Sequence, residues 1–223
     1  MSDFSEARFN MVESQIRPNQ VTDAHLLRAL LEVPREKFVP ASMRALAYME
    51  DKIVVAQASA GAPARSMMSP MPMARMIQLA EVDPDDLVLD VGCLSGYTTA
   101  LLARLAESVV GLECNESLAE QASQILMEYE ADNAAVVSGH LPEGYASEGP
   151  FDVIMLNGSV PEVPAALLKQ LKDGGRLVAI IAQSSFGEAT LFRNTAGRIS
   201  QRAAFDASAQ PLPGFEREQE FVF

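Results

Sequence analysis

The chain has 223 residues, of which 48% are hydrophobic, so it can bury a substantial core without disulfides or a structural metal. Its 30 acidic residues outnumber the 17 basic ones, and a formal net charge of −13 argues against a nucleic-acid partner, because phosphate binding needs concentrated Lys and Arg. No apolar run has the length and flanks of a membrane span or a signal peptide, and two cysteines fit a reducing compartment. We therefore expect a cytoplasmic protein with neither a nucleic-acid nor a membrane partner.

The first 60 residues precede the first strand of the predicted main sheet. Apolar residues at helical spacing predict two helices, the second capped by Thr22, and a third helix near residues 42–48, followed by a β-prone segment at 53–55. We interpret residues 1–60 as a helical cap and residues 61–223 as the main domain, the two forming one compact unit.

A methionine-rich stretch follows this cap. Residues 57–69 are rich in Ala, Ser, Gly and Pro and predict a loop, after which PMPMARMIQLAEV resumes helical spacing. Five methionines between positions 67 and 76 offer thioether sulfurs of the kind that bind Cu(I). With no His or Cys nearby, adaptable packing of an amphipathic helix is the better interpretation. We therefore predict no metal site.

The stretch LVLDVGCLSGYTTALL, residues 87–102, has the pattern of a buried strand, a glycine turn and a helix. At the carboxyl edge of a parallel sheet, such a turn presents backbone N–H groups to a nucleotide-like ligand. Glu113 closes the next predicted strand, close to the roughly 20-residue spacing at which an acidic side chain accepts hydrogen bonds from a ribose. The sequence thus predicts a nucleoside site.

Strands and helices alternate after this turn. SVVGLE, AAVVS, FDVIML and RLVAIIA are predicted strands, with helices at residues 116–129 and 164–171 and a turn at KDGG. This order predicts an α/β fold in three layers, with a mostly parallel sheet and right-handed crossovers. The C-terminal part predicts a hairpin around residues 195–197 and a closing strand at EREQEFVF, which give antiparallel pairing at the edge.

Seven segments spread over residues 11–182 carry a family likeness. They are MVESQI, RALLEVPREKFVP, the Ala47-Tyr48 pair, the Ser69-Pro70 pair before a helix, LVLDVGCLSGY, VVGLE, and FDVIMLNGSVPEVPAALLKQLKDGGRLV. Together they resemble the protein-L-isoaspartate O-methyltransferases. The resemblance implies a seven-stranded, Rossmann-like methyltransferase sheet with S-adenosylmethionine as cofactor. It also implies methyl transfer to the carboxylate of isoaspartyl or D-aspartyl residues in damaged proteins.

The same resemblance implies which residues form the site. The cofactor site would consist of Asp90, Gly92, Cys93, Ser95 and Gly96 around the amino-acid end, Glu113 at the ribose, Gly139 and His140 beside the adenine, and Asn157 below the methionine part. Ser69 is the candidate for orienting the substrate carboxylate. We expect one sizeable functional pocket at the sheet edge, lined by Gly92, Ser95, Gly96, Glu113, His140 and Asn157.

Three positions depart from the family pattern. Leu94 replaces the middle glycine of the turn, His140 replaces an acidic residue, and Met68 replaces a hydroxyl residue, with Ser69 following in place of glutamine. A left-handed backbone at Leu94 would cost roughly 1 to 2 kcal/mol. Either the leucine enters the cofactor's space or it turns into the protein, and both arrangements predict weaker cofactor binding.

The implied reaction needs no catalytic base, because a substrate carboxylate with a pKa near 4 is ionised at pH 7. Orientation by hydroxyl and amide donors supplies the rate instead, so Met68 predicts slow methylation unless Ser66 or Ser69 compensates. A paralogue that binds a nucleoside or protein partner without turnover, and a small-molecule methyltransferase, stay open as alternatives. A nicotinamide dehydrogenase is disfavoured, because Thr98 stands where its glycine motif needs a small last residue.

Two cysteines and two histidines complete the candidates. Cys93 and Cys114 end neighbouring predicted strands and are expected to be small buried residues rather than a redox pair. His140 is either a pH-sensitive ligand contact or an exposed loop residue, and His25 is expected at the surface.

Overall fold

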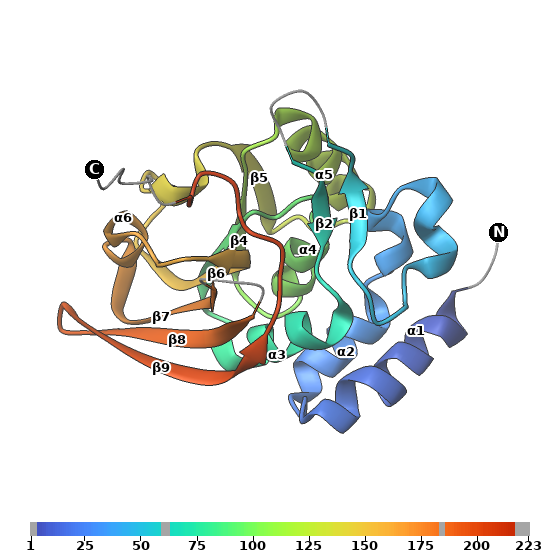
Figure 1. Cartoon of the computed structure of the whole chain (residues 1–223), viewed down its shortest axis with the longest axis horizontal. Helices are drawn as coiled ribbons and strands as arrows, with labels where there is room; N and C mark the ends of the chain where they lie inside the picture. Colours follow the sequence, from blue (N-terminus) through green and yellow to red (C-terminus); the bar gives the residue numbers. More distant parts are fainter. Residues whose placement is uncertain (1–3, 59–62, 183–185, 217–223) are drawn as a thin grey trace, which may run out of the picture.

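The computed structural model describes residues 4–58, 63–182 and 186–216. They form a seven-stranded sheet with helices packed against it, an N-terminal layer of short helices and a separate two-stranded sheet (Figure 1). Among these residues, no helix has both the length and the hydropathy needed to cross a membrane.

The main sheet confirms the predicted α/β fold. Its strands lie in the spatial order β5 (Ala134–Ser138), β4 (Ser108–Glu113), β3 (Leu87–Val91), β6 (Phe151–Val160), β7 (Leu171–Ala182), β8 (Gly187–Thr195) and β9 (Arg198–Ala207). Strands β5 to β7 run parallel, and β8 and β9 add to β7 in antiparallel pairing. The carboxyl ends of the five parallel strands therefore meet at one edge of the sheet.

Short helices make up the N-terminal layer, on the right in Figure 1. They are α1 (Ser5–Met11), a π-helical turn (Val12–Ile16), α2 (Ala24–Glu32) and 3₁₀ helices at Arg17–Asn19, Arg35–Phe38 and Ala41–Leu46. The cap of α2 is Asp23 and not Thr22, because the Asp23 carboxylate accepts the Leu26 N–H at 2.8 Å. The third helix expected near residues 42–48 is present as the last 3₁₀ helix.

A two-stranded antiparallel sheet joins β1 (Ile53–Ala56) to β2 (Arg65–Met67). Strand β1 was expected, whereas β2 lies in the stretch 57–69 that we predicted to be a loop. The Ala, Ser, Gly and Pro composition of that stretch favours a loop, but pairing with β1 supplies backbone partners that override this local preference. The pairing spans the proposed boundary at residue 60, and that division stays a prediction.

Four α-helices surround the main sheet. They are α3 (Pro70–Ala80), α4 (Tyr97–Ala103), α5 (Glu116–Glu128) and α6 (Ala165–Leu168). The last of these is shorter than predicted, because β7 begins at Leu171 and includes the KDGG segment that we predicted as a turn. A register shift between Phe151 and Val153 of β6 accommodates the extra residues.

Strand β6 extends past the predicted FDVIML to Val160. Its pairing with β7 shifts register between Met155 and Ser159, so the segment containing Asn157 and Gly158 interrupts the regular pairing with β7. This irregularity lies at the carboxyl edge and leaves the Asn157 side chain available to groups beyond the sheet.

The C-terminal hairpin lies where the sequence predicts it. Ala196 and Gly197 connect β8 to β9 with φ angles of 52° and 78°, the paired left-handed conformations typical of a tight hairpin turn. The closing strand predicted at EREQEFVF falls almost entirely outside the described residues.

Two hydrophobic clusters cover opposite faces of the sheet. Along β3, Val88 belongs to the cluster shared with α3, α4, α5 and the N-terminal helices, while Leu89 and Val91 belong to the cluster shared with α6. Leu212, from the segment after β9, packs into this second cluster. Because both faces are covered, the carboxyl edge is where a ligand can reach the sheet.

Candidate functional site

The glycine turn after β3 is held by backbone hydrogen bonds to β4. The N–H groups of Gly92 and Cys93 both donate to the Leu112 carbonyl, at 2.8 and 3.2 Å. Gly92, Leu94 and Gly96 have φ angles of 79°, 56° and 90°. The left-handed conformation considered for Leu94 is thus confirmed, and Leu94 is the one non-glycine of the three.

The Leu94 side chain is buried. It is 3% exposed and belongs to the same hydrophobic cluster as Tyr97 and Leu118. Of the two arrangements that we considered, this burial agrees with the leucine turned into the protein. Gly96 combines a left-handed backbone with close packing, since a Cβ there would lie 3.3 Å from Cβ of Ala122 in α5.

Ser95 is predicted in the cofactor loop, and its hydroxyl has a partner within the protein. Its Oγ donates to the Phe38 carbonyl at 2.5 Å, which fastens the glycine turn to the N-terminal layer. Phe38 in turn contacts Tyr97 edge-on, with ring centroids 5.5 Å apart. The turn is therefore supported from the cap side as well as from β4.

Glu113 faces the glycine turn, as the nucleoside-site prediction requires. Its buried carboxylate accepts the Leu94 N–H at 2.9 Å and also the N–H groups of Cys114 and Asn115, at 3.0 and 3.1 Å. It also forms an ion pair with Arg65, whose Nη1 and Nη2 lie 2.7 and 3.2 Å from its two oxygens. No local pattern in the sequence indicates this pair, because Arg65 lies in the Ala- and Ser-rich stretch before α3.

Asp90 lies on β3, just before the glycine turn, and is fully buried. Its Oδ2 accepts the Thr99 hydroxyl at 2.8 Å, whereas its Oδ1 has no hydrogen-bond partner among the described residues. Burial, with a smaller contribution from the Glu113 charge, raises the pKa of Asp90 to about 7. An acceptor without a donor at this point is suited to a ligand N–H or a water molecule.

The two cysteines differ in exposure. Cys93 is buried, and burial raises the pKa of its thiol well above the ordinary value. Cys114 is exposed, which corrects the expectation that both are buried, and its sulfur accepts from Arg65 Nη1 at 3.3 Å. Burial is also the main cause that raises the pKa of the Cys114 thiol.

Gly139 and His140 lie at the tip of β5, next to the tip of β4. The Gly139 N–H donates to the Glu113 carbonyl at 3.0 Å. The His140 side chain is 62% exposed, with Nδ1 3.4 Å from Glu143, so it corresponds to the exposed-loop interpretation. His25 is exposed, as expected.

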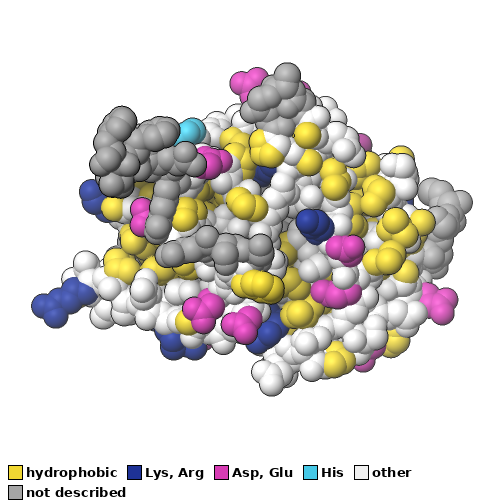
Figure 2. All heavy atoms as spheres, in the orientation of Figure 1, with side chains coloured by type: hydrophobic (Ala, Val, Ile, Leu, Met, Phe, Trp, Pro, Cys, Tyr) yellow, Lys and Arg dark blue, Asp and Glu magenta, His cyan; other side chains and the backbone are white. Residues whose placement is uncertain are grey.

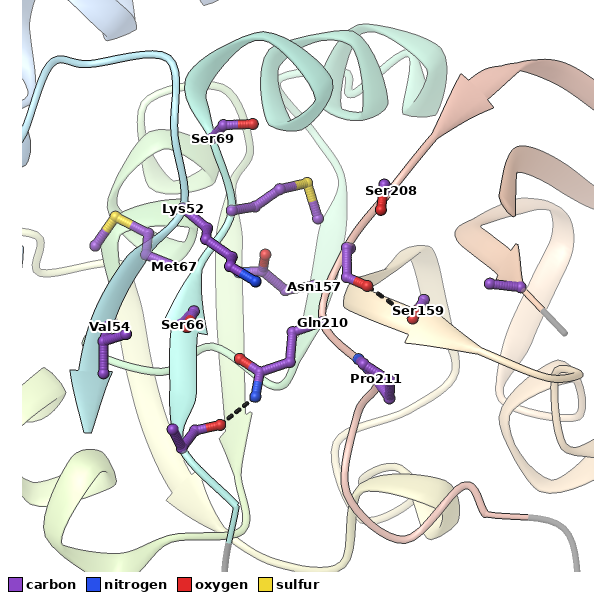
Figure 3. Close-up of a pocket in the computed structure, with 14 residues that line it drawn as sticks. Lys52, Val54, Ser66, Met67, Ser69, Asn157, Ser159, Ser208, Gln210 and Pro211 are labelled. Carbon is purple, nitrogen blue, oxygen red and sulfur yellow. Dashed lines mark hydrogen bonds between the residues drawn. The ribbon is translucent and has the colours of Figure 1, made fainter. Parts of the chain in front are cut away.

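A cavity of about 750 Å³ opens beside the glycine turn, between the β1–β2 sheet, the tip of β6 and the segment after β9 (Figure 3). Its described lining consists of Lys52, Val54, Ala64, Ser66, Met67, Met68, Ser69, Asn157, Ser159, Ala182, Ser208, Ala209, Gln210 and Pro211. Of the six residues that we expected to share one pocket, only Asn157 lines this cavity. Other hollows of about 540 and 730 Å³ lie elsewhere on the described surface, so this cavity is not the only sizeable one. That the functional pocket is the one at the sheet edge stays a prediction.

The other expected residues face different neighbours: Leu212 of the C-terminal segment lies over Gly92, Arg65 binds Glu113, and the His140 side chain is exposed. Residues 208–216 cross the carboxyl edge and are held by Ser159, whose N–H and carbonyl bond Gln210 and Leu212 at 2.9 Å each. The Leu212 side chain packs against the backbone of both Gly92 in the glycine turn and Gly158 in β6. A Cβ on either glycine would lie 2.6 or 2.7 Å from it. The chain's own residues thus fill the groove above the glycine turn.

Lys52 is the one charged residue among those that line the cavity in the described part of the chain. Figure 3 shows its side chain directed into the cavity from the start of β1, and no described residue accepts a hydrogen bond from its ammonium. Basic side chains are sparse on the face shown in Figure 2, in line with the net charge of −13. The remaining polar lining groups are hydroxyls and amides.

Ser69 lines the cavity next to Met68, and its role in orienting a substrate carboxylate stays a prediction. Its hydroxyl hydrogen-bonds the Glu50 carboxyl, whose pKa is raised by partial burial against the opposing effect of this bond. The backbone of Met68 is fixed from behind by Arg35, a fully buried guanidinium that donates to the Met68 carbonyl at 2.6 Å. Arg35 also stacks over the Tyr97 ring at 4.7 Å, so it connects the cavity wall to α4.

Sequence reasoning therefore missed Arg65, Lys52, Arg35 and Leu212. Arg35 lies within RALLEVPREKFVP, but that segment carries the family likeness without marking Arg35 as a site residue. Arg65, Lys52 and Leu212 lie outside the segments that carry the likeness, and the local pattern has no signal for their positions at the site. No group of three or more His, Cys, Asp or Glu side chains suited to a metal occurs in the described part of the chain.

Comparison with known proteins identifies the family. The family model described as protein-L-isoaspartate(D-aspartate) O-methyltransferase matches residues 6–212. Among curated proteins named protein-L-isoaspartate O-methyltransferase, one from Koribacter versatilis is 33% identical, covering 96% of this chain and 94% of that protein. One from Serratia proteamaculans is 34% identical, covering 80% and 83%.

Solved structures agree on the fold. A protein-L-isoaspartate O-methyltransferase with 25% identity superposes with a TM-score of 0.79, covering 95% of this chain and 66% of that one. A Plasmodium falciparum structure described as such an enzyme in complex with S-adenosyl-L-homocysteine gives a TM-score of 0.75 at 20% identity, covering 95% and 99%. The chain belongs to the protein-L-isoaspartate(D-aspartate) O-methyltransferase family.

Proposed function

We propose that this protein transfers the methyl group of S-adenosylmethionine to the carboxylate of isoaspartyl residues in damaged proteins. The observation that carries the proposal is the position of Asn157. Its Nδ2 donates to the Thr98 hydroxyl at 2.7 Å, at the start of the helix that follows the glycine turn, and the same side chain lines the cavity. A cofactor on the turn and an acceptor in the cavity would therefore meet at one residue.

The residue types at the glycine turn have the hydrogen-bonding groups that an S-adenosylmethionine site requires. Glu113 offers a buried carboxylate for ribose hydroxyls, and Asp90 Oδ1 is an acceptor without a partner among the described residues. Gly92 and Gly158 present backbone without side chains at the two strand tips. Leu212 and Arg65 occupy this groove now, so cofactor binding requires both side chains to move.

The cavity fits an anionic acceptor. The Lys52 ammonium would pair with the substrate carboxylate, while Ser66 and Asn157 supply uncharged polar groups beside it. Val54, Met67 and Met68 make the rest of the wall largely apolar, which limits water around the reacting groups. The bound cofactor would supply a methyl group activated by the positive sulfonium. The protein's contribution is to align the carboxylate with that methyl, because an ionised carboxylate needs no base.

The location and partners form part of the same proposal. Two free cysteines and the excess of acidic residues support a cytoplasmic protein that acts on isoaspartyl peptides and not on nucleic acid.

A second candidate function is a paralogue that keeps the fold without turnover. One observation favours it, namely that Arg65 already holds both carboxylate oxygens of Glu113. Such a protein would bind a nucleoside or a protein partner and would not methylate any isoaspartyl peptide.

Methyl transfer from labelled S-adenosylmethionine to a synthetic peptide with one isoaspartyl residue tests the proposal. The same peptide with an ordinary aspartyl residue is the matched control. We expect label in the isoaspartyl peptide alone, as a base-labile ester. Absence of label at saturating cofactor and peptide would contradict the proposal and support the second candidate.

A further inference from the structure

We propose that Arg65 sets the cofactor affinity of this protein by competing with the ribose for Glu113, and that it couples the cofactor site to the acceptor cavity. The inference rests on the proposed function, because it takes the ligand of the turn to be S-adenosylmethionine. It concerns a residue that no motif of the sequence singles out.

The hydrogen bonds around Glu113 leave no free acceptor site. A carboxylate offers about four lone-pair positions. Five N–H donors already approach the two oxygens: two from Arg65 and one each from the backbone of Leu94, Cys114 and Asn115. A ribose hydroxyl can donate to Glu113 only if one of these groups withdraws.

Arg65 is the group that can withdraw. The three backbone donors belong to the glycine turn and to the start of α5, where Gly92, Cys93 and Asn115 are fixed by further hydrogen bonds. The Arg65 side chain is held at this point only through its guanidinium, which bonds Glu113 and Cys114. Cys114 is exposed, so a route toward solvent begins beside the present position of the guanidinium.

The pair also replaces part of what a ligand would provide. Glu113 is fully buried and Arg65 is 6% exposed, so each neutralises a charge that would be costly to leave alone. A ribose that displaced Arg65 would take over the hydrogen bonds to Glu113 without a compensating charge. Cofactor affinity is therefore lower than it would be for the same turn without an arginine at this position.

The coupling follows from the position of Arg65 in the chain. It begins β2, and the next three residues, Ser66, Met67 and Met68, all line the acceptor cavity. The preceding residue, Ala64, accepts a hydrogen bond from Gln210 of the C-terminal segment (Figure 3). Releasing Arg65 from Glu113 removes an anchor of this cavity wall, so occupancy of one site changes the affinity of the other.

Calorimetric titration with S-adenosylhomocysteine, which lacks the sulfonium charge, tests the first part. Arg65→Met removes the guanidinium and keeps the length of the side chain, while Arg65→Lys keeps the charge and loses the two-pronged contact. Arg75→Met is the control for net charge. Arg75 lies on α3, outside the site, with its guanidinium over the ring of Phe205 from β9. We expect Arg65→Met to bind about 5- to 150-fold more tightly than the wild type, with Arg65→Lys between them and the control unchanged. Equal or weaker binding by Arg65→Met would overturn the competition.

Nuclear magnetic resonance of the arginine side chains in the wild type gives a result that does not depend on a variant folding. The Arg65 Nε resonance should move and broaden when S-adenosylhomocysteine saturates the protein, because the ion pair opens. An unchanged resonance in the saturated complex would contradict the proposal.

The coupling is tested by the affinity for an isoaspartyl peptide with and without S-adenosylhomocysteine. The wild type should show at least a fivefold difference that is lost in Arg65→Met. The same difference in both proteins would contradict the coupling. If the wild type binds S-adenosylhomocysteine but never methylates the peptide, the proposed activity fails while the titrations still decide the role of Arg65.

Discussion

Leu94 holds a left-handed backbone, a conformation that glycine adopts without steric cost, and it buries its side chain in the core. Two opposite effects follow from removing that side chain. Lost packing destabilises the protein by about 2 to 5 kcal/mol, while glycine relieves strain worth roughly 1 kcal/mol.

Leu94→Ala is the matched variant, because it loses nearly the same packing and keeps the strain. Chemical denaturation should show Leu94→Gly more stable than Leu94→Ala by about 1 kcal/mol, though both are less stable than the wild type. The glycine variant should also bind S-adenosylmethionine more tightly than the wild type. Equal stabilities of Leu94→Gly and Leu94→Ala would contradict backbone strain at this position. Equal, tight binding of S-adenosylmethionine by Leu94→Gly and the wild type would show that Leu94 does not weaken cofactor binding.

Asp90 makes the stability depend on pH. Its pKa is raised in the folded protein from an ordinary 3.8 to about 7, so between these values the folded state binds a proton that the unfolded state has lost. The contribution to stability is therefore fully present below about pH 4 and is lost as the pH rises toward 7.

Urea denaturation of the wild type and Asp90→Asn at pH 5, 6 and 7 measures this effect. The free energy of unfolding of the wild type should fall relative to that of the variant by up to about 1.4 kcal/mol per pH unit. A difference between the two proteins that stays constant with pH would show that Asp90 is ionised throughout. The variant keeps an acceptor for the Thr99 hydroxyl, so the fold is preserved.

At the scale of elements, the β1–β2 sheet supplies one wall of the acceptor cavity. Lys52, just before β1, and Ser66 of β2 both line the cavity, as does Met67, which pairs with Ile53 across the two strands. Because Lys52 is the one cation on the described lining, it should govern the binding of a carboxylate more than the alignment of the methyl group.

Steady-state kinetics with an isoaspartyl peptide should therefore show a raised KM for Lys52→Met, by about 5- to 50-fold, with a smaller change in kcat. Lys37→Met, on the 3₁₀ helix Arg35–Phe38, is the control for net charge. A normal KM in Lys52→Met would mean that the substrate carboxylate lies elsewhere. A fall in kcat alone would assign Lys52 to alignment instead.

The elements also show where local sequence is a sufficient guide. The strand, glycine turn and helix at residues 87–102 were predictable, because buried strands and amphipathic helices have different periods and glycine marks the turn between them. Strand β2 and the short α6 were not, since their extent depends on pairing with β1 and on the register of β6 against β7. Tertiary pairing decides such cases.

For the whole molecule, the fold and the family could be predicted from the sequence. The two side chains that occupy the groove at the glycine turn, Arg65 and Leu212, could not. Glu113 was predicted at the turn from its spacing and faces it in the structure. Its partner Arg65 comes from a stretch without periodicity, and Leu212 arrives from beyond the last strand. Neither contact has a signal in the local pattern, because each joins segments far apart in the chain.

The central claim is that Glu113 belongs to a nucleoside site at the carboxyl edge of the sheet. Calorimetric titration of S-adenosylhomocysteine into the wild type, Glu113→Ala and Glu113→Gln tests it directly, with Glu116→Ala as the control on an exposed glutamate of α5. We predict one binding site per chain in the wild type and the control, weakened by about 1 to 3 kcal/mol in Glu113→Ala through loss of charge-assisted hydrogen bonds. Unchanged affinity in both Glu113 variants would contradict the account.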